Sequence, residues 1–286
     1  ERLTHDMSAR PVDTPNVVLV VLDAVRPDHL SCYGYWRPTT PNLERLCERD
    51  ATRYTRAHST SGWTPPAHAS LFTGRYPSRH GVLANLPLPP EVPTLAECLR
   101  RRGYYTAGLA NMFHVSRQRG FARGHEYYFT PFDLRTMRIP LLGERAVEFS
   151  SDMAAYLFAR LFYDYDPSWR LLRKAVRQMR VSHPFYLFLN LNSAHSPYRA
   201  PRPFQGRFVR PRDLEGLDIA RLRVLAQRAG YAYMAGAIEV SEREWNVLRG
   251  WYDEEIAWID HLLGRMIAFL QRSGEYDNTL VIITAD

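Results

Sequence analysis

Two aspartates each stand directly after an apolar run that is typical of a buried strand. Asp23 follows Val17–Leu22, and Asp286 follows Leu280–Ala285. Ligands of an open parallel sheet bind beyond the carboxyl ends of its strands, so both carboxylates are expected at a ligand site. An aspartate that ends a strand can simply cap the next turn, and for either residue alone that explanation is the better one. Two of them on separate strands favour a divalent cation held by carboxylate oxygens.

A second candidate for chemistry is the segment from Thr64 to His68, which reads Thr-Pro-Pro-Ala-His. Pro65 suits the first turn of a helix, which makes Thr64 the expected N-cap. The two prolines have no N–H groups, so they cannot donate a hydrogen bond to the threonine oxygen. This oxygen lies at the N-terminal end of the helix, where the helix dipole stabilises anions. His68 follows one turn later on the same face. An ordinary threonine cap beside a partly buried histidine explains these residues equally well.

Two further side chains are placed to contact an anion bound at this edge of the sheet. His195 follows an apolar run that ends near Leu191, and Arg26 lies three residues after Asp23. Each of the two, taken alone, is more often an ordinary loop residue or a surface charge. Together with the aspartates they form a hypothetical anion and cation site.

The elements that must position these residues alternate along the chain. Four apolar runs without polar alternation predict strands that are covered on both faces. They are Val17–Leu22, Tyr105–Ala110, Phe185–Leu191 and Leu280–Thr284. Helix-like stretches separate them, and this pattern predicts an α/β fold with a largely parallel central sheet and helices on both faces.

Helices are predicted most clearly at two places. Thr94 and Glu97 form a capping-box pattern that opens a helix through Arg102, and Gly103 stands where the C-terminal cap is expected. Glu242–Arg272 carries apolar residues at helical spacing. The segment 129–180 mixes aromatic clusters with arginines and is interpreted as a helical insertion packed on the sheet. A lid, or a face that meets a membrane or a partner, is the alternative.

The overall composition excludes several protein classes. The chain has 286 residues, of which 45% are hydrophobic and 23% charged, so disordered, collagen-like and coiled-coil classes do not fit. No apolar run reaches the roughly 18 residues that a transmembrane helix needs, and no signal peptide is visible. Three cysteines form neither an even disulfide set nor a zinc pattern, which favours a reducing, cytoplasmic location.

The formal net charge is +7, and Lys174 is the sole lysine among 37 basic residues. The arginines are scattered rather than gathered in one run, so nucleic-acid binding is not expected. The charge favours a small anionic substrate. The oligomeric state stays open.

Five blocks, in the same order along the chain, resemble the sulfatase family of the alkaline-phosphatase superfamily. They are Asn16–Tyr35, Thr39–Leu46, Thr64–Gly81, Pro184–Tyr198 and Tyr252–Asp286. The resemblance implies an alkaline-phosphatase-like α/β/α sandwich whose catalytic domain covers 15–286 and lacks its C-terminal part. It also implies one divalent cation, commonly calcium in sulfatases, with manganese, magnesium or zinc as alternatives.

The resemblance also assigns roles residue by residue. It implies that Asp23 and Asp286 are metal ligands, and that Thr64 is both the nucleophile and a ligand. His68 stands where sulfatases usually have arginine, and His195 matches the histidine that binds the substrate anion. Asn111 replaces a lysine and is taken as substrate-binding. Arg26 is also taken as substrate-binding, from its position close to Asp23 rather than from the resemblance.

Two departures from the family pattern bear on mechanism. Ala24 stands where a second aspartate is common, and Thr64 stands where sulfatases have a cysteine or serine that is oxidised to formylglycine. A threonine cannot form this aldehyde, because oxidation of a secondary alcohol gives a ketone. The chain also stops at Asp286, before a further family metal ligand, so the chain as given is expected to be inactive or nearly so.

These observations predict a metal-dependent hydrolase or transferase that cleaves sulfate or phosphate (di)esters by attack from Thr64. Threonine chemistry favours phosphorus, whereas the similarity of the blocks favours sulfur, and both are kept. A non-catalytic binding domain on the same scaffold is the alternative, suggested by Ala24 and Asn111. A nucleic-acid-binding protein is suggested only by the isoelectric point.

Overall fold

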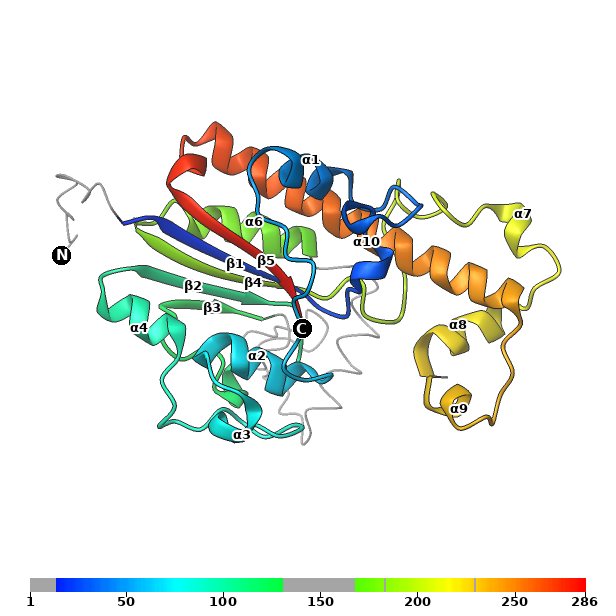
Figure 1. Ribbon diagram of the computed structural model, residues 1–286, viewed down its shortest axis with the longest axis horizontal. Helices are drawn as coiled ribbons and strands as arrows, with labels where there is room; N and C mark the ends of the chain where they lie inside the picture. Colours follow the sequence, from blue (N-terminus) through cyan, green and yellow to red (C-terminus); the bar gives the residue numbers. More distant parts are fainter. Residues whose placement is uncertain (1–13, 131–167, 183, 229) are drawn as a thin grey trace, which may run out of the picture.

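A five-stranded sheet forms the centre of the protein in the computed structural model, which describes residues 14–130, 168–182, 184–228 and 230–286 (Figure 1). Its strands are β1 (Asn16–Leu22), β2 (Tyr105–Ala110), β3 (Tyr127–Phe129), β4 (Phe185–Leu191) and β5 (Thr279–Ala285). Their order across the sheet is β3-β2-β4-β1-β5, and every pair is parallel. The predicted α/β fold with a parallel sheet is therefore confirmed.

The strand boundaries agree closely with the apolar runs. β2 and β4 have the predicted limits, β1 begins one residue earlier, and β5 extends by one residue at each end. The edge strand β3 was not predicted, because three residues are too few to show a periodicity.

Helices cover both faces of this sheet, as Figure 1 shows. On one face lie α1 (Pro41–Arg49), α6 (Ser168–Gln178) and α10 (Glu242–Arg272). On the other lie α2 (Thr64–Thr73), α3 (Pro77–His80) and α4 (Leu95–Arg101). The three layers match the α/β/α arrangement that the sequence predicts.

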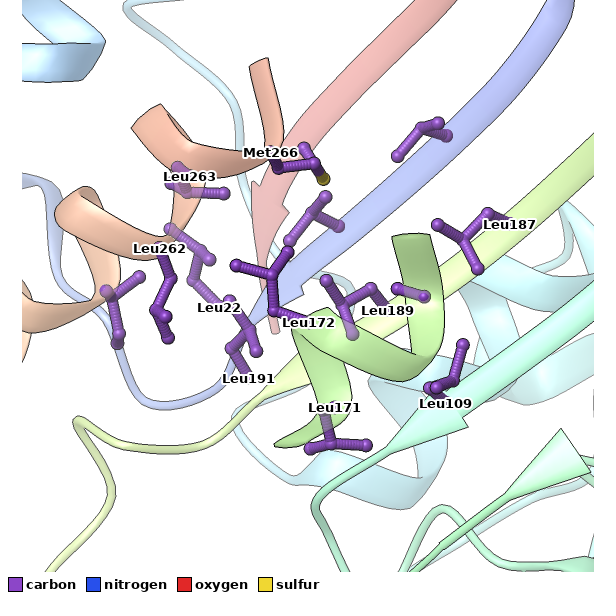
Figure 2. Packing of buried hydrophobic residues seen from close by; sticks show 14 of the residues in the cluster. Leu22, Leu109, Leu171, Leu172, Leu187, Leu189, Leu191, Leu262, Leu263 and Met266 are labelled. Carbon is purple, nitrogen blue, oxygen red and sulfur yellow. The ribbon is translucent and has the colours of Figure 1, made fainter. Parts of the chain in front are cut away.

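Alternation along β1 explains why both faces need a cover. Val18, Val20 and Leu22 point into one buried cluster, which includes Met266 of α10, whereas Leu19 and Val21 point into the other. Figure 2 shows Leu22, Leu189 and Leu191 meeting residues of α6 and α10. Because β1 is packed on both faces, the position of its carboxyl end, which leads to Asp23, is fixed by the two buried clusters.

The two helices predicted from the sequence are present. α4 has the expected capping box, since Thr94 Oγ1 accepts from Glu97 N at 3.2 Å and Glu97 Oε2 accepts from Thr94 N at 2.8 Å. This helix ends at Arg101, one residue before the expected limit, and Gly103 follows with φ +85°. The helix α10 has the predicted limits, because a second capping box at Ser241 opens it.

The remaining helices are short and lie in the connections. They are α7 (Pro211–Leu214), α8 (Ile219–Arg228), α9 (Gly230–Met234), and the 3-10 turns η1 (Pro27–His29), η2 (Ser31–Tyr33), η3 (Arg117–Arg119) and η4 (Tyr276–Asn278). The segment α7–α9 packs on the N-terminal part of α10 around Leu222 and Trp251. None of the described helices is long and apolar enough to cross a membrane.

The helical insertion expected at 129–180 falls largely outside the described residues, which omit 131–167. Phe129 belongs to β3, and α6 occupies the end of the segment. The insertion therefore stays a prediction for its central part.

Candidate active site

The two aspartates leave adjacent strands at the same edge of the sheet. Leu22 of β1 is the register partner of Ala285 of β5, so Asp23 and Asp286 follow paired positions. Asp23 is 1% exposed, and its N–H donates to Leu191 O at 2.8 Å. Burial raises the pKa of Asp23 well above its usual value, the charge of Asp286 raises it further, and a hydrogen bond from Asn190 opposes the rise. The pair is a cluster of negative charge that a cation would relieve.

The helix α2 places Thr64 at this edge, although Thr64 is not the N-cap. Trp63 is the cap, because its carbonyl accepts the first helical bond, from Ala67 N at 3.1 Å. Thr64 is therefore the first helical residue, and the prolines that lack N–H groups are the second and third. The expected cap was wrong by one position. The threonine still lies in the first turn, where the helix dipole favours an anion.

His68 connects this turn to the strands. Its Nδ1 lies 3.1 Å from Thr64 O and 3.6 Å from Asp286 Oδ2, and its Nε2 lies 3.3 Å from Asn190 Nδ2. Since Nδ1 donates to the carbonyl, Nε2 accepts from the amide. Burial lowers the pKa of His68, and the Asp286 charge opposes this only partly. A neutral imidazole therefore bridges α2, β4 and β5.

Asn190 was missed in the sequence and is central to the site. It is the penultimate residue of β4, it is fully buried, and its amide contacts His68 and Asp23. The signal was a single polar residue in the apolar run Phe185–Leu191. Asn111, predicted from the resemblance, lies next to it: it is 2% exposed, and its N–H donates to Asn190 O at 3.3 Å.

Three buried side-chain oxygens at the carboxyl ends of β1, β2 and β4 lack partners within the described part of the chain, and they are of the type that a hard cation binds. Asp23 Oδ2, Asn111 Oδ1 and Asn190 Oδ1 are buried and have no hydrogen-bond partner among the described residues. Unpaired buried oxygens are costly unless something binds them. Within the same residues, no group of three or more His, Cys, Asp or Glu side chains could hold a metal. A cation here would therefore be held by two carboxylates supplemented by amide or hydroxyl oxygens.

The structure does not bring Arg26 into this cluster. Its side chain is 69% exposed, and the guanidinium pairs with Asp28, with Nη2 to Oδ2 at 2.6 Å and Nε to Oδ1 at 3.0 Å. His195 lies on the loop after β4 and is half-buried, and its Nδ1 is 3.0 Å from Ser196 O. That contact assigns the hydrogen to Nδ1 and leaves Nε2 as the nitrogen that can exchange a proton.

The profile of the sulfatase family matches residues 15–286, which is nearly the whole chain. The chain belongs to the sulfatase family. Human arylsulfatase A is 27% identical and matches 97% of this chain and 52% of its own length. A multifunctional alkaline phosphatase superfamily protein, PehA of Trinickia caryophylli, is also 27% identical and matches 95% of this chain.

Solved structures support the fold of this sulfatase-family chain. The phosphonate monoester hydrolase of Agrobacterium radiobacter superimposes with a TM-score of 0.68 at 20% identity, over 95% of this chain and 62% of that protein. At this identity the match shows the alkaline-phosphatase-like fold alone. The chain spans between half and two thirds of the length of these relatives.

Proposed function

We propose that this chain carries the catalytic site of a metal-dependent hydrolase that cleaves phosphate or sulfate esters by attack from Thr64. The observation that carries the proposal is the arrangement at the carboxyl edge of the sheet. Buried Asp23 and Asp286 follow paired strand positions, and the first turn of α2 contacts Asp286 through His68. Membership of the sulfatase family supports ester hydrolysis as the reaction class.

Asp23 and Asp286 would hold the cation, with the Thr64 hydroxyl and a buried amide oxygen completing the set. Calcium is the first choice, because all these donors are oxygens; magnesium, manganese and zinc are alternatives. A divalent cation at this position supplies Lewis acidity, which lowers the pKa of a bound hydroxyl and neutralises charge on the attacked group.

Thr64 attacks the phosphorus or sulfur atom in line with the departing alcohol oxygen. A bond forms from Thr64 Oγ1 to the central atom, and the bond to the alcohol oxygen breaks. The hydroxyl proton passes to water. His195, once its Nε2 has taken up a proton from water, gives that proton to the alcohol oxygen. Water then hydrolyses the Thr64 ester and regenerates the hydroxyl.

His68 contacts the helical turn that carries Thr64 rather than the reacting group. It is neutral and fully buried, and its two ring nitrogens are engaged by Thr64 O and Asn190 Nδ2, so it positions Thr64 and adds no positive charge. Asn111 likewise offers an amide where the resemblance implies a lysine. The site therefore has fewer cationic groups than the family pattern implies, and Arg26 is engaged by Asp28.

Phosphorus is the preferred central atom. Threonine cannot yield the formylglycine aldehyde, so the route by which sulfatases release sulfate from its hydrate is closed. A phosphonate monoester hydrolase among the fold neighbours and a multifunctional superfamily protein among the relatives are compatible with this preference.

The second candidate is a non-catalytic domain that binds an anionic ester. It is favoured by Ala24 at the position of a common second aspartate and by the outward pairing of Arg26. A binding domain would retain substrate affinity after the loss of Thr64 and would show no turnover.

A panel of aryl sulfate, phosphate monoester, phosphodiester and phosphonate substrates, each with Ca²⁺, Mg²⁺, Mn²⁺ and Zn²⁺, tests the proposal on the full polypeptide. We expect turnover of at least one phosphorus ester, and Thr64→Ala should lower its rate strongly. Trapping with a slow ester, followed by peptide mapping, should locate the adduct on Thr64. An adduct on Ser59, Thr60 or Ser61, or full turnover in Thr64→Ala, would contradict the nucleophile assignment.

A further inference from the structure

Tyr252 of α10 reaches the turn that follows β1. Its hydroxyl donates to Ala24 O at 2.8 Å and accepts from Arg26 N at 2.9 Å. One hydroxyl therefore satisfies backbone groups on both sides of Val25. The tyrosine is 8% exposed, and burial raises its pKa, so the phenol stays protonated and can donate.

The turn that Tyr252 contacts has an unusual backbone. Ala24 has φ +60°, in the left-handed region that residues with a side chain disfavour by roughly 1–2 kcal/mol. In this conformation its N–H donates to Asp286 Oδ1 at 3.1 Å. The amide thus fixes one oxygen of Asp286 at the place where the resemblance implies a second aspartate.

The same part of α10 also braces the loop that carries His195. The Tyr252 ring centroid lies 5.6 Å from that of Tyr198 and 5.0 Å from that of His29, the latter edge-on. The next residue, Asp253, is fully buried and accepts from Arg37 Nη1 at 2.6 Å, while its other oxygen lies 2.6 Å from His29 Nδ1. One turn of α10 therefore holds the loops after β1 and β4.

We propose that Tyr252 is a positioning residue for the cation pair. Its hydroxyl holds Ala24 in the left-handed conformation, and the Ala24 N–H in turn orients the Asp286 carboxylate toward the ion that Asp23 shares. The inference rests on the proposed function, because it assumes that Asp23 and Asp286 bind a cation. Tyr252 itself does not contact the reacting atoms.

Tyr252→Phe removes only the hydroxyl, and Tyr104→Phe is its matched control. Tyr104 is also 8% exposed, and its hydroxyl donates to Pro15 O at 2.8 Å, just before the opposite end of β1. Calorimetric titration of the full polypeptide with Ca²⁺, Mg²⁺, Mn²⁺ and Zn²⁺ measures the cation affinity. The melting temperature without cation measures the loss of stability that each substitution causes. We expect Tyr252→Phe to weaken cation binding about tenfold, and Tyr104→Phe to leave it within twofold while lowering the melting temperature similarly.

A second variant tests the route through Ala24. Glycine adopts a positive φ without the side-chain penalty, so Ala24→Gly should restore part of the cation affinity in the Tyr252→Phe background. If Tyr252→Phe alone does not fold, the double variant Tyr252→Phe/Ala24→Gly is compared with Ala24→Gly alone. The double variant should bind the cation more weakly.

The outcomes separate the two proposals. Equal cation affinities in Tyr252→Phe and the wild type, or equal losses in Tyr252→Phe and Tyr104→Phe, would overturn the positioning role alone. Failure of Ala24→Gly to restore affinity would overturn the route through the turn. A wild-type protein that binds none of the four cations would overturn the positioning role together with the cation site of the proposed function.

Discussion

Leu22 and Ala285 are register partners in the parallel strands β1 and β5. The residue after each is an aspartate, so backbone pairing rather than side-chain flexibility determines that Asp23 and Asp286 leave the sheet side by side. Asp23 is buried, and the neighbouring negative charge raises its pKa. A change of charge at Asp23 should therefore alter cation binding without moving the strands.

Asp23→Asn should raise the stability of the cation-free protein and abolish its stabilisation by added cation. The substitution removes a buried charge that faces Asp286, while the amide keeps the shape of the side chain. A gain of about 1 kcal/mol would raise the melting temperature by roughly 2–4 °C in a domain of this size. Thermal melts with and without Ca²⁺ or Mn²⁺ measure both effects.

The control for this substitution is Asp28→Asn, which removes an exposed carboxylate that pairs with Arg26. It should change neither the cation response nor, by more than about 0.5 kcal/mol, the stability. A cation response that persists in Asp23→Asn would contradict the assignment of the ligand.

Thr64→Ala should lower kcat for the best ester by roughly 10³-fold or more, equivalent to about 4 kcal/mol of barrier. Thr64→Ser should keep much of the activity, because the hydroxyl remains at the first position of α2. Thr60→Ala, on the exposed loop before this helix, is the control and should be neutral. Steady-state kinetics on the full polypeptide decide between these outcomes, and comparable losses in both alanine variants would argue against a role for Thr64 in the chemistry.

The sequence was sufficient for elements whose signals are local. α10 carries apolar residues at helical spacing, and β4 is apolar except for Asn190, so the limits of both were predicted correctly. β3 was missed, because a three-residue strand forms only when β2 provides a partner. The cap of α2 was misplaced by one residue, because two prolines fit the first turn whether it begins at Thr64 or at Pro65, whereas the first helical hydrogen bond is accepted by Trp63 O.

The candidate site was predicted only in part, for a similar reason. Strand-end position was enough to find Asp23 and Asp286. The role of Asn190 depends on contacts with side chains from α2 and β1, which no local pattern shows. Arg26 was expected to face the site, but a carboxylate two residues away is a nearer partner. The catalytic and metal-binding roles of these residues stay predictions.

His125 should make the protein less stable in acid. It is 8% exposed and lies among Phe72, Tyr128, Tyr186 and Phe188. Burial lowers its pKa from 6.5 to about 4; the backbone of Ala122 and Arg123 opposes this shift only partly, and the charge of Arg117 adds to it.

The unfolded chain therefore binds more protons than the folded chain between these two values. The stability contributed by neutral His125 is complete above pH 6.5 and is lost as the pH falls toward 4, by up to ~3 kcal/mol at 1.36 kcal/mol per unit. His125→Phe should flatten the pH dependence of the free energy of unfolding in that window, whereas His58→Phe, on an exposed loop, should not. Urea melts from pH 4 to 7 provide the measurement, and parallel curves for His125→Phe and the wild type would refute the expectation.

Gly124→Ala should be far more damaging than Gly274→Ala. Both glycines have positive φ, +80° and +72°, so each substitution carries a similar conformational penalty. A β-carbon at position 124 would lie 2.2 Å from the backbone N of Glu97, whereas at position 274 it would meet nothing within 4 Å. We expect a loss of about 1 kcal/mol at position 274 and roughly 2 kcal/mol more at 124. Chemical denaturation compares the two, and equal losses would show that the start of α4 yields easily.

The order of the strands across the sheet has a consequence for synthesis on the ribosome. β1 is made first among the strands, yet its two neighbours come much later: Asn16 bonds to residues 169 and 263 positions further along. At roughly 5–20 residues per second, β1 waits from about ten seconds to nearly a minute for both partners. During this time the segment Asn-Val-Val-Leu-Val-Val-Leu stays without its sheet, and such a segment readily pairs with other chains. Yield of soluble protein should therefore depend on chaperones that hold this nascent segment.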